Sequence, residues 1–205
     1  MLKQALVQNG LVAILRGLRP EEAPVIGDVL YTAGFRVIEV PLNSPQPYDS
    51  IRLLRQRLPA DCLIGAGTVL TPEQVRQVKE AGGQVIVMPH SDPEVLRAAK
   101  AEGLLLSPGV ATPTEALSAL SAGADGLKLF PFEALGVPAL KAWRAVLPKD
   151  ASLIPVGGIT PGSIAELSAA GAAGVGIGSA LYKAGMSRDE VTNRAKEFVA
   201  ARAAL

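Results

Sequence analysis

The sequence predicts an α/β fold in which eight parallel strands, each followed by a helix, close into a single (β/α)8 TIM barrel. Short apolar runs rich in β-branched residues recur eight times along the 205 residues. Helix-start signals stand between these runs, and the dipeptide Ala-Gly repeats where helices would end. Such a regular alternation of strand and helix favours an all-parallel sheet, and closure of eight strands gives the barrel. A doubly wound open sheet is the structural alternative.

The order of the elements follows from the spacing of these runs. The expected strands are Val12–Leu15, Val37–Val40, Leu63–Ala66, Val85–Met88, Leu104–Leu106, Gly126–Phe130, Leu153–Val156 and Gly174–Ile177. Thr71, Asp92 and Thr112 each precede a proline, with an acidic residue following, which is typical of a helix N-terminus. Glycines end the helical stretches at Gly34, Gly82, Gly103, Gly123 and Gly171. No linker or low-complexity segment interrupts the pattern, so we expect one domain over residues 1–205.

The composition excludes several classes of protein. With 20 Lys and Arg against 19 Asp and Glu, the net charge is +1, which argues against binding to nucleic acid. No apolar run is long enough to span a membrane, and the N-terminus lacks the pattern of a signal peptide, so we expect a cytoplasmic protein. The single cysteine, Cys62, and the single histidine, His90, disfavour a disulfide and a His-rich metal site. Arg52, Arg55 and Arg57 fall on one expected helix and are interpreted as solvated.

Lys128 is the strongest candidate for chemistry. It lies in an apolar strand between Leu127 and Leu129. Because side chains alternate along a strand, the leucines are expected to face the helices and Lys128 the barrel interior. Burial lowers the pKa of a lysine, and the neutral amine is the form that attacks a ketone to give a Schiff base. The alternative is an interior lysine held in a salt bridge, without chemistry.

Glu39 repeats the same logic. It lies between Ile38 and Val40, so alternation directs it inward as well. A carboxyl group near a reactive amine can carry protons to and from a substrate. Its alternative role is that of a structural counter-ion for Lys128 or Arg16.

Two glycine-rich turns follow the seventh and eighth expected strands, at Gly157-Gly158 and Gly178-Ser179. Backbone N–H groups in such turns, at the N-termini of helices, bind anions, and phosphate sites recur at these positions of barrels. Ordinary turn glycines are the alternative interpretation.

Arg16 and Thr68 follow the first and third expected strands. A guanidinium group and a hydroxyl group can together bind a carboxylate. In the alternative interpretation, Arg16 is a surface loop residue and Thr68 begins a turn.

Seven segments near the strand ends carry a resemblance: Ala13–Gly17, Val37–Pro45, Gly65–Leu70, Ser107–Gly109, Leu127–Pro131, Val156–Ile159 and Gly176–Ser179. In order and spacing they resemble the class I 2-keto-3-deoxy-6-phosphogluconate/phosphogalactonate aldolases over essentially the whole chain. The resemblance implies a homotrimeric (β/α)8 barrel that needs no metal or other cofactor. The segment Pro41–Pro45 is similar to the phosphogalactonate branch of the family.

The resemblance also implies roles for the residues above. Lys128 would form the Schiff base and Glu39 would carry protons, while Arg16 and Thr68 would bind the substrate carboxylate. The phosphate would lie among Gly157, Gly158, Gly178 and Ser179. The implied reaction is cleavage of 2-dehydro-3-deoxy-6-phospho-D-galactonate to pyruvate and D-glyceraldehyde 3-phosphate.

Three alternatives to that reaction stay open. The same chemistry could act mainly on the phosphogluconate epimer. The chain could instead be a non-catalytic phosphosugar-binding barrel, against which the presence of both Lys128 and Glu39 argues. A metal-dependent aldolase is disfavoured by the single histidine.

Overall fold

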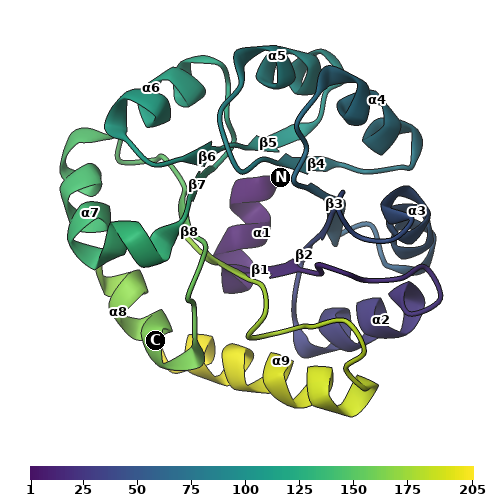
Figure 1. Cartoon of the computed structure of the whole chain (residues 1–205). Coiled ribbons are helices and arrows are strands. Elements are labelled where there is room, and N and C mark those ends of the chain that lie inside the picture. The colour runs from purple at the N-terminus through teal and green to yellow at the C-terminus, as the bar shows by residue number, and fades with distance from the viewer.

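The computed structural model describes residues 1–205, and its strands form a ring surrounded by helices (Figure 1). The strands are β1 (Leu11–Ile14), β2 (Val37–Pro41), β3 (Leu63–Gly67), β4 (Val85–Val87), β5 (Leu105–Ser107), β6 (Gly109–Val110), β7 (Leu127–Leu129), β8 (Leu153–Pro155) and β9 (Val175–Ile177). The helices are α1 (Leu2–Asn9), α2 (Ala23–Ala33), α3 (Pro47–Arg57), α4 (Pro72–Glu80), α5 (Pro93–Ala101), α6 (Pro113–Ser121), α7 (Phe132–Val146), α8 (Ile164–Ala169) and α9 (Arg188–Ala203), with a 3₁₀ turn, η1 (Pro161–Ser163), before α8.

The strands close into a parallel barrel through two seams. Six strands pair in the order β5-β4-β3-β2-β1-β9 and three in the order β6-β7-β8. A bridge between Val156 and Gly176 joins the two groups at one seam. At the other seam, β5 and β6 are two parts of one strand separated by Pro108, whose nitrogen cannot donate a hydrogen bond. The predicted barrel is therefore confirmed, and the fifth strand runs beyond the predicted Leu104–Leu106.

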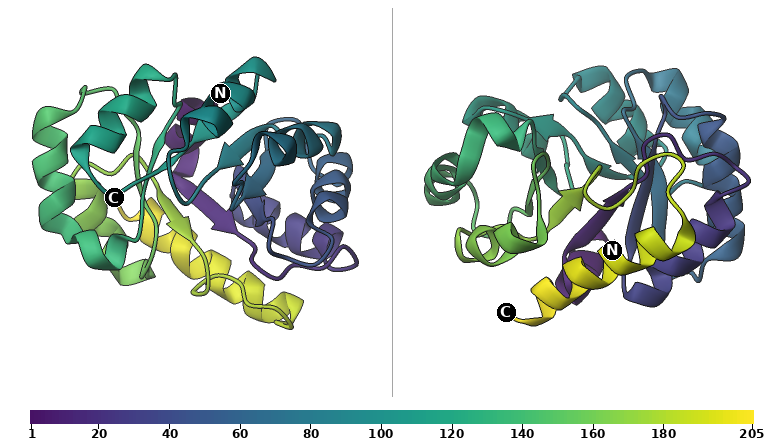
Figure 2. Two further views of the ribbon diagram at one scale, coloured as in Figure 1. Left: turned by 45° about the horizontal axis from the view of Figure 1, so that its top comes forward. Right: turned by 60° about the horizontal axis from the view of Figure 1, so that its bottom comes forward.

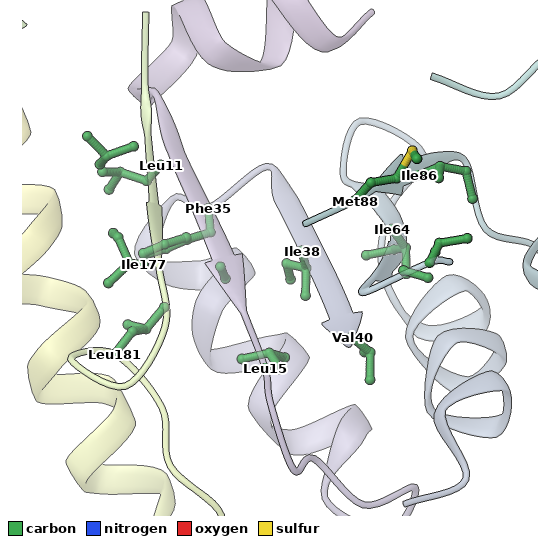
Figure 3. Close-up of a cluster of buried hydrophobic side chains, with 14 of the residues drawn as sticks. Leu11, Leu15, Phe35, Ile38, Val40, Ile64, Ile86, Met88, Ile177 and Leu181 are labelled. Carbon is green, nitrogen blue, oxygen red and sulfur yellow. The ribbon is translucent and has the colours of Figure 1, made fainter. Parts of the chain in front are cut away.

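Side chains from the barrel fill two separate apolar layers. The outward layer packs strands against helices and includes Leu11, Ile38, Ile64 and Ile177, shown in Figure 3. The inward layer lines the barrel interior with Val12, Ile14, Val37, Leu63, Val85, Val87, Ile154 and Val156. This alternation is the period-two pattern expected of strands covered on both faces.

Helix α1, which the sequence analysis did not predict, closes the N-terminal end of the barrel. It lies at the centre of the ring in Figure 1. Its buried Leu2 and Leu6 belong to the inward layer, and their side chains lie beside Gly126 and Gly174. Those two glycines precede β7 and β9, so α1 covers the end of the barrel opposite to the carboxyl ends of the strands.

The predicted helix signals are confirmed. The side chains of Thr71, Asp92 and Thr112 accept hydrogen bonds from backbone N–H groups in the first turns of α4, α5 and α6. The glycines that follow the helical stretches all adopt positive φ: Gly34, Gly82, Gly103, Gly123 and Gly171. These caps explain why short helices alternate cleanly with short strands.

One expectation about the surface was wrong. Arg55 of α3 is not simply solvated, because its guanidinium group donates to the carbonyl oxygens of Leu58, Pro59 and Cys62 and to the side chain of Gln84. These bonds tie the loop after α3 to the start of β3.

Helix α9 lies along the outside of the barrel (Figure 2) and packs against α2 and α8. None of the helices has the length and the apolar character needed to cross a membrane.

Candidate active site

Lys128 lies at the middle of β7 and points into the barrel. Its neighbours Leu127 and Leu129 belong to the outward layer, as predicted. Lys128 is 6% exposed, and its Nζ lies 4.7 Å from the centroid of the Phe130 ring. Burial lowers the pKa of Lys128; the carboxyl group of Glu39 opposes this shift, and the charge of Arg16 adds to it. A larger fraction of the amine is therefore neutral at a given pH than for a lysine in water.

Glu39 of β2 faces the same interior. It is 1% exposed, and burial raises its pKa to about 7, against the opposing charges of Lys128 and Arg16. Its Oε2 atom has no hydrogen-bond partner, and it forms no salt bridge with Lys128. The absence of a salt bridge disfavours the interpretation of Glu39 and Lys128 as a structural ion pair.

Glu39 and Lys128 border one small space inside the barrel. The buried hydroxyl-bearing Ser107 and the apolar Leu2 line it as well. A Cβ atom at Gly67 would overlap the carboxyl group of Glu39, so the glycine at the end of β3 leaves room for it. Gly67 was not among the predicted site residues, although the Gly-Ala-Gly sequence at the end of this strand indicates a close approach of another group. No group of three or more His, Cys, Asp or Glu side chains is arranged to hold a metal ion.

A larger cavity of about 420 Å³ opens above Lys128 at the carboxyl ends of the strands. Six of the eight predicted site residues line it: Arg16, Lys128, Gly157, Gly158, Gly178 and Ser179. Lys128 borders both this cavity and the small space that contains Glu39, so its side chain connects the two. Ten further residues line the cavity without a predicted site role, among them Phe130, Glu133, Tyr182 and Lys183.

The two predicted carboxylate-binding residues differ in their placement. Arg16 follows β1 and lines the cavity, where its Nη1 donates to Oδ1 of Asn43 at 2.7 Å. Thr68 follows β3 in a left-handed conformation, with φ of +56°, and does not line the cavity. Its contact with a substrate remains a prediction.

The glycine turns present free hydrogen-bond donors to the cavity. The backbone N–H groups of Gly158, Ser179 and Ala180 donate to no acceptor within the protein. Gly157 and Gly158 have φ of +117° and +67°, which glycine adopts at little cost.

No α-helix begins at either glycine turn, which corrects one expectation. The 3₁₀ turn η1 begins only at Pro161, and a single turn follows β9. An anion bound here would therefore meet individual N–H groups and nearby cations such as Lys183. The carboxylate of Glu133, which also lines the cavity beside the Gly157-Gly158 turn, carries the opposite charge.

Comparison with known proteins assigns a family to this arrangement. Residues 2–197 match the model of the family described as "Aldolase: KDPG and KHG aldolase". The chain belongs to this family. The predicted family is thereby confirmed. The buried Lys128 lies inside the barrel of a member of this aldolase family.

Individual relatives align in sequence with this chain over nearly their full lengths. The aldolase is 48% identical to a probable 2-dehydro-3-deoxy-6-phosphogalactonate aldolase of Rhizobium meliloti, covering 95% of this chain and 92% of the relative. It is 47% identical to the 2-dehydro-3-deoxy-6-phosphogalactonate aldolase of Escherichia coli, covering 93% of each.

Solved structures agree as well. One described as "Native KDPGal structure" is 46% identical, with a TM-score of 0.92 over 95% of this chain and 96% of the other. A KDPG aldolase from Legionella pneumophila, solved with pyruvate captured as a covalent carbinolamine, is 29% identical with a TM-score of 0.83, covering 100% of this chain and 97% of the other.

Proposed function

We propose that this aldolase is a class I enzyme that cleaves 2-dehydro-3-deoxy-6-phospho-D-galactonate to pyruvate and D-glyceraldehyde 3-phosphate. The observation that carries the proposal is the buried Lys128, whose pKa is lowered by burial and whose amine lies at the floor of a cavity with free anion-binding donors. The two relatives at 47–48% identity support the galactonate substrate, and the carbinolamine of the Legionella relative supports the covalent chemistry.

The substrate would lie across the cavity with its two anionic ends apart. Arg16, assisted by Thr68, would bind the carboxylate next to the C2 ketone. The N–H groups of the turns at Gly157-Gly158 and Gly178-Ser179 would bind the phosphate. Lys128 lines the same cavity as Arg16 and the glycine turns, so a substrate held at both ends would have its C2 ketone within reach of the amine.

Covalent chemistry at Lys128 would then proceed with Glu39 moving protons. The neutral amine attacks C2, and the resulting carbinolamine loses its hydroxyl as water with a proton from Glu39, leaving an iminium. The Glu39 carboxylate takes the proton of the C4 hydroxyl as the C3–C4 bond breaks, and the iminium accepts the electron pair to become an enamine. After the aldehyde leaves, Glu39 returns its proton to C3, and water hydrolyses the iminium to free pyruvate and Lys128.

A turnover assay on both C4 epimers of the phosphorylated substrate tests this proposal. We expect a higher kcat/KM for the galactonate epimer, with pyruvate as the measured product. A higher value for the gluconate epimer would contradict the substrate assignment and retain the chemistry. The absence of turnover on both would favour a phosphosugar-binding barrel. A Lys128→Ala variant is the control for background cleavage.

The remaining expectations concern the whole protein. We infer one catalytic domain over residues 1–205, a homotrimer and a cytoplasmic location. Sedimentation equilibrium tests the assembly directly, since a trimer of the 21.2 kDa chain and a monomer differ threefold in mass.

A further inference from the structure

Arg194 of α9 contacts the second glycine turn from outside the barrel. Its Nη1 atom donates to the carbonyl oxygens of Ser179 at 3.1 Å and Ala180 at 3.2 Å. Arg194 forms no salt bridge, whereas several other surface arginines do. Its side-chain hydrogen bonds are therefore made to this turn.

The contacts determine where the free N–H groups of the turn point. In a trans peptide the C=O and N–H bonds point in opposite directions, and the peptides of this turn are trans. The carbonyl of Gly178 accepts from Leu181 and Tyr182 at 2.9 and 3.0 Å, so the N–H of Ser179 points away from that turn. The carbonyl of Ser179 is bound by Arg194, so the N–H of Ala180 points away from α9.

Both of these N–H groups lack an acceptor, and both residues line the cavity. We propose that Arg194 is a positioning residue for the phosphate subsite: it holds the carbonyl of Ser179 outward, so that the N–H group of Ala180 faces a bound phosphate beside that of Ser179. This inference rests on the proposed function.

Arg194→Met tests the inference, with Arg202→Met as the matched control. Arg202 lies on the same helix, and its replacement by Met removes the same charge. Its Nη1 donates instead to Oγ of Ser168 at 3.1 Å, and Arg202 does not line the cavity. For Arg194→Met we expect KM for the phosphorylated substrate to rise about tenfold, because the anion's hydrogen bonds lose their orientation. The kcat on the phosphorylated substrate should stay within about twofold of that of the parent enzyme. The kcat/KM on unphosphorylated 2-keto-3-deoxygalactonate should also stay within about twofold. Inhibition by inorganic phosphate should weaken in parallel.

Three results would overturn the positioning role. They are an unchanged KM in Arg194→Met, an equal loss of kcat/KM on phosphorylated and unphosphorylated substrate, and an equal rise of KM in Arg202→Met. Trapping of pyruvate on Lys128 by borohydride reports an intact barrel in each variant without using the phosphate subsite. Arg194→Lys, which keeps the charge and one donor, should recover part of the affinity. If the parent enzyme itself shows no preference for the phosphorylated substrate, it is the phosphate assignment of the proposed function that fails, not the positioning role alone.

Discussion

Lys128 and Glu39 share an interior that disfavours charge on both side chains. Burial lowers the pKa of the lysine and raises that of the glutamate to about 7. The two groups are coupled, so moving one proton between them converts a neutral pair into an ion pair. The space they share with Leu2 and Ser107 is small and lined mostly by apolar side chains. The arrangement costs stability and maintains a neutral amine for attack on a ketone.

Borohydride reduction in the presence of pyruvate should inactivate the enzyme and add one pyruvyl group at Lys128. The reason is that the buried, neutral amine forms an iminium, which borohydride reduces irreversibly. Peptide mass mapping locates the adduct, and Lys183, an exposed lysine of the same cavity, is the internal control. An adduct on Lys183 alone would contradict the assignment, and activity restored by a divalent ion after chelation would point to metal-dependent chemistry.

Glu39→Gln should lower kcat by about 10²–10⁴-fold, the usual contribution of a positioned acid–base group. The amide keeps the shape of the side chain but cannot accept and return a proton. Steady-state kinetics measure the loss, and slower pyruvate trapping on Lys128 should persist. A near-normal kcat would leave Glu39 with a structural role only.

The stability of the parent enzyme should fall as pH rises from about 4.5, the ordinary pKa of a glutamate, to about 7, the raised pKa of Glu39. In this window the unfolded chain has lost the proton that the folded protein still holds, so the slope is negative. The full effect is about 3 kcal/mol. Chemical denaturation at several pH values measures it, and Glu39→Gln should abolish this part of the slope. An equal slope in parent and variant would contradict the raised pKa.

At the scale of elements, the carboxyl ends of the strands supply the cavity and the turns after β8 and β9 supply its donors. The two turns differ in how their conformations are held. Gly157 and Gly158 need glycine because of their positive φ and the close side chain of Glu133. Gly178 has neither constraint, since a Cβ atom there would meet nothing within 4 Å. A side chain at Gly178 would therefore be accepted by the fold.

Gly178→Leu should reduce kcat/KM on the phosphorylated substrate by at least about tenfold, because the added side chain enters the cavity beside Ser179. Thermal unfolding should be unchanged, and pyruvate should still be trapped on Lys128. Gly162→Leu, which adds the same side chain outside the cavity, is the matched control. If Gly178→Leu had the kcat/KM of the parent enzyme, the turn at Gly178 would not be part of the phosphate subsite.

At the scale of the whole molecule, the barrel has one closed end and one open end. Helix α1 fills the N-terminal end with Leu2 and Leu6, and the cavity occupies the other. Leu6→Ala should lower the free energy of unfolding by about 2–4 kcal/mol, because it leaves a gap in the inward layer. Chemical denaturation measures the loss, and KM should remain that of the parent enzyme.

The control for this prediction is Val7→Ala on the same helix. Val7 is 78% exposed, so its truncation should change the free energy of unfolding by less than about 0.5 kcal/mol. Equal effects of the two substitutions would show that α1 does not depend on its contact with the barrel.

The local pattern of the sequence determined the strands, the helix caps and the inward direction of Lys128 and Glu39. Alternation along a strand has a period of two residues, so a single polar residue among apolar neighbours reveals which face it occupies. Resemblance of the strand-end segments then identified the family before any contact between them was known.

Tertiary structure alone decided the features that depend on segments far apart in the chain. Only three apolar side chains of α1 are buried, and their partners lie at the starts of distant strands. Thr68 follows β3 and falls outside the cavity, which is lined from β1, β7, β9 and the segments after β1, β7, β8 and β9. Arg194 reaches the turn after β9 from the last helix. The periodicity of apolar residues within one segment carries no information about such contacts. They form because the closed barrel brings segments that are distant in sequence close together in space.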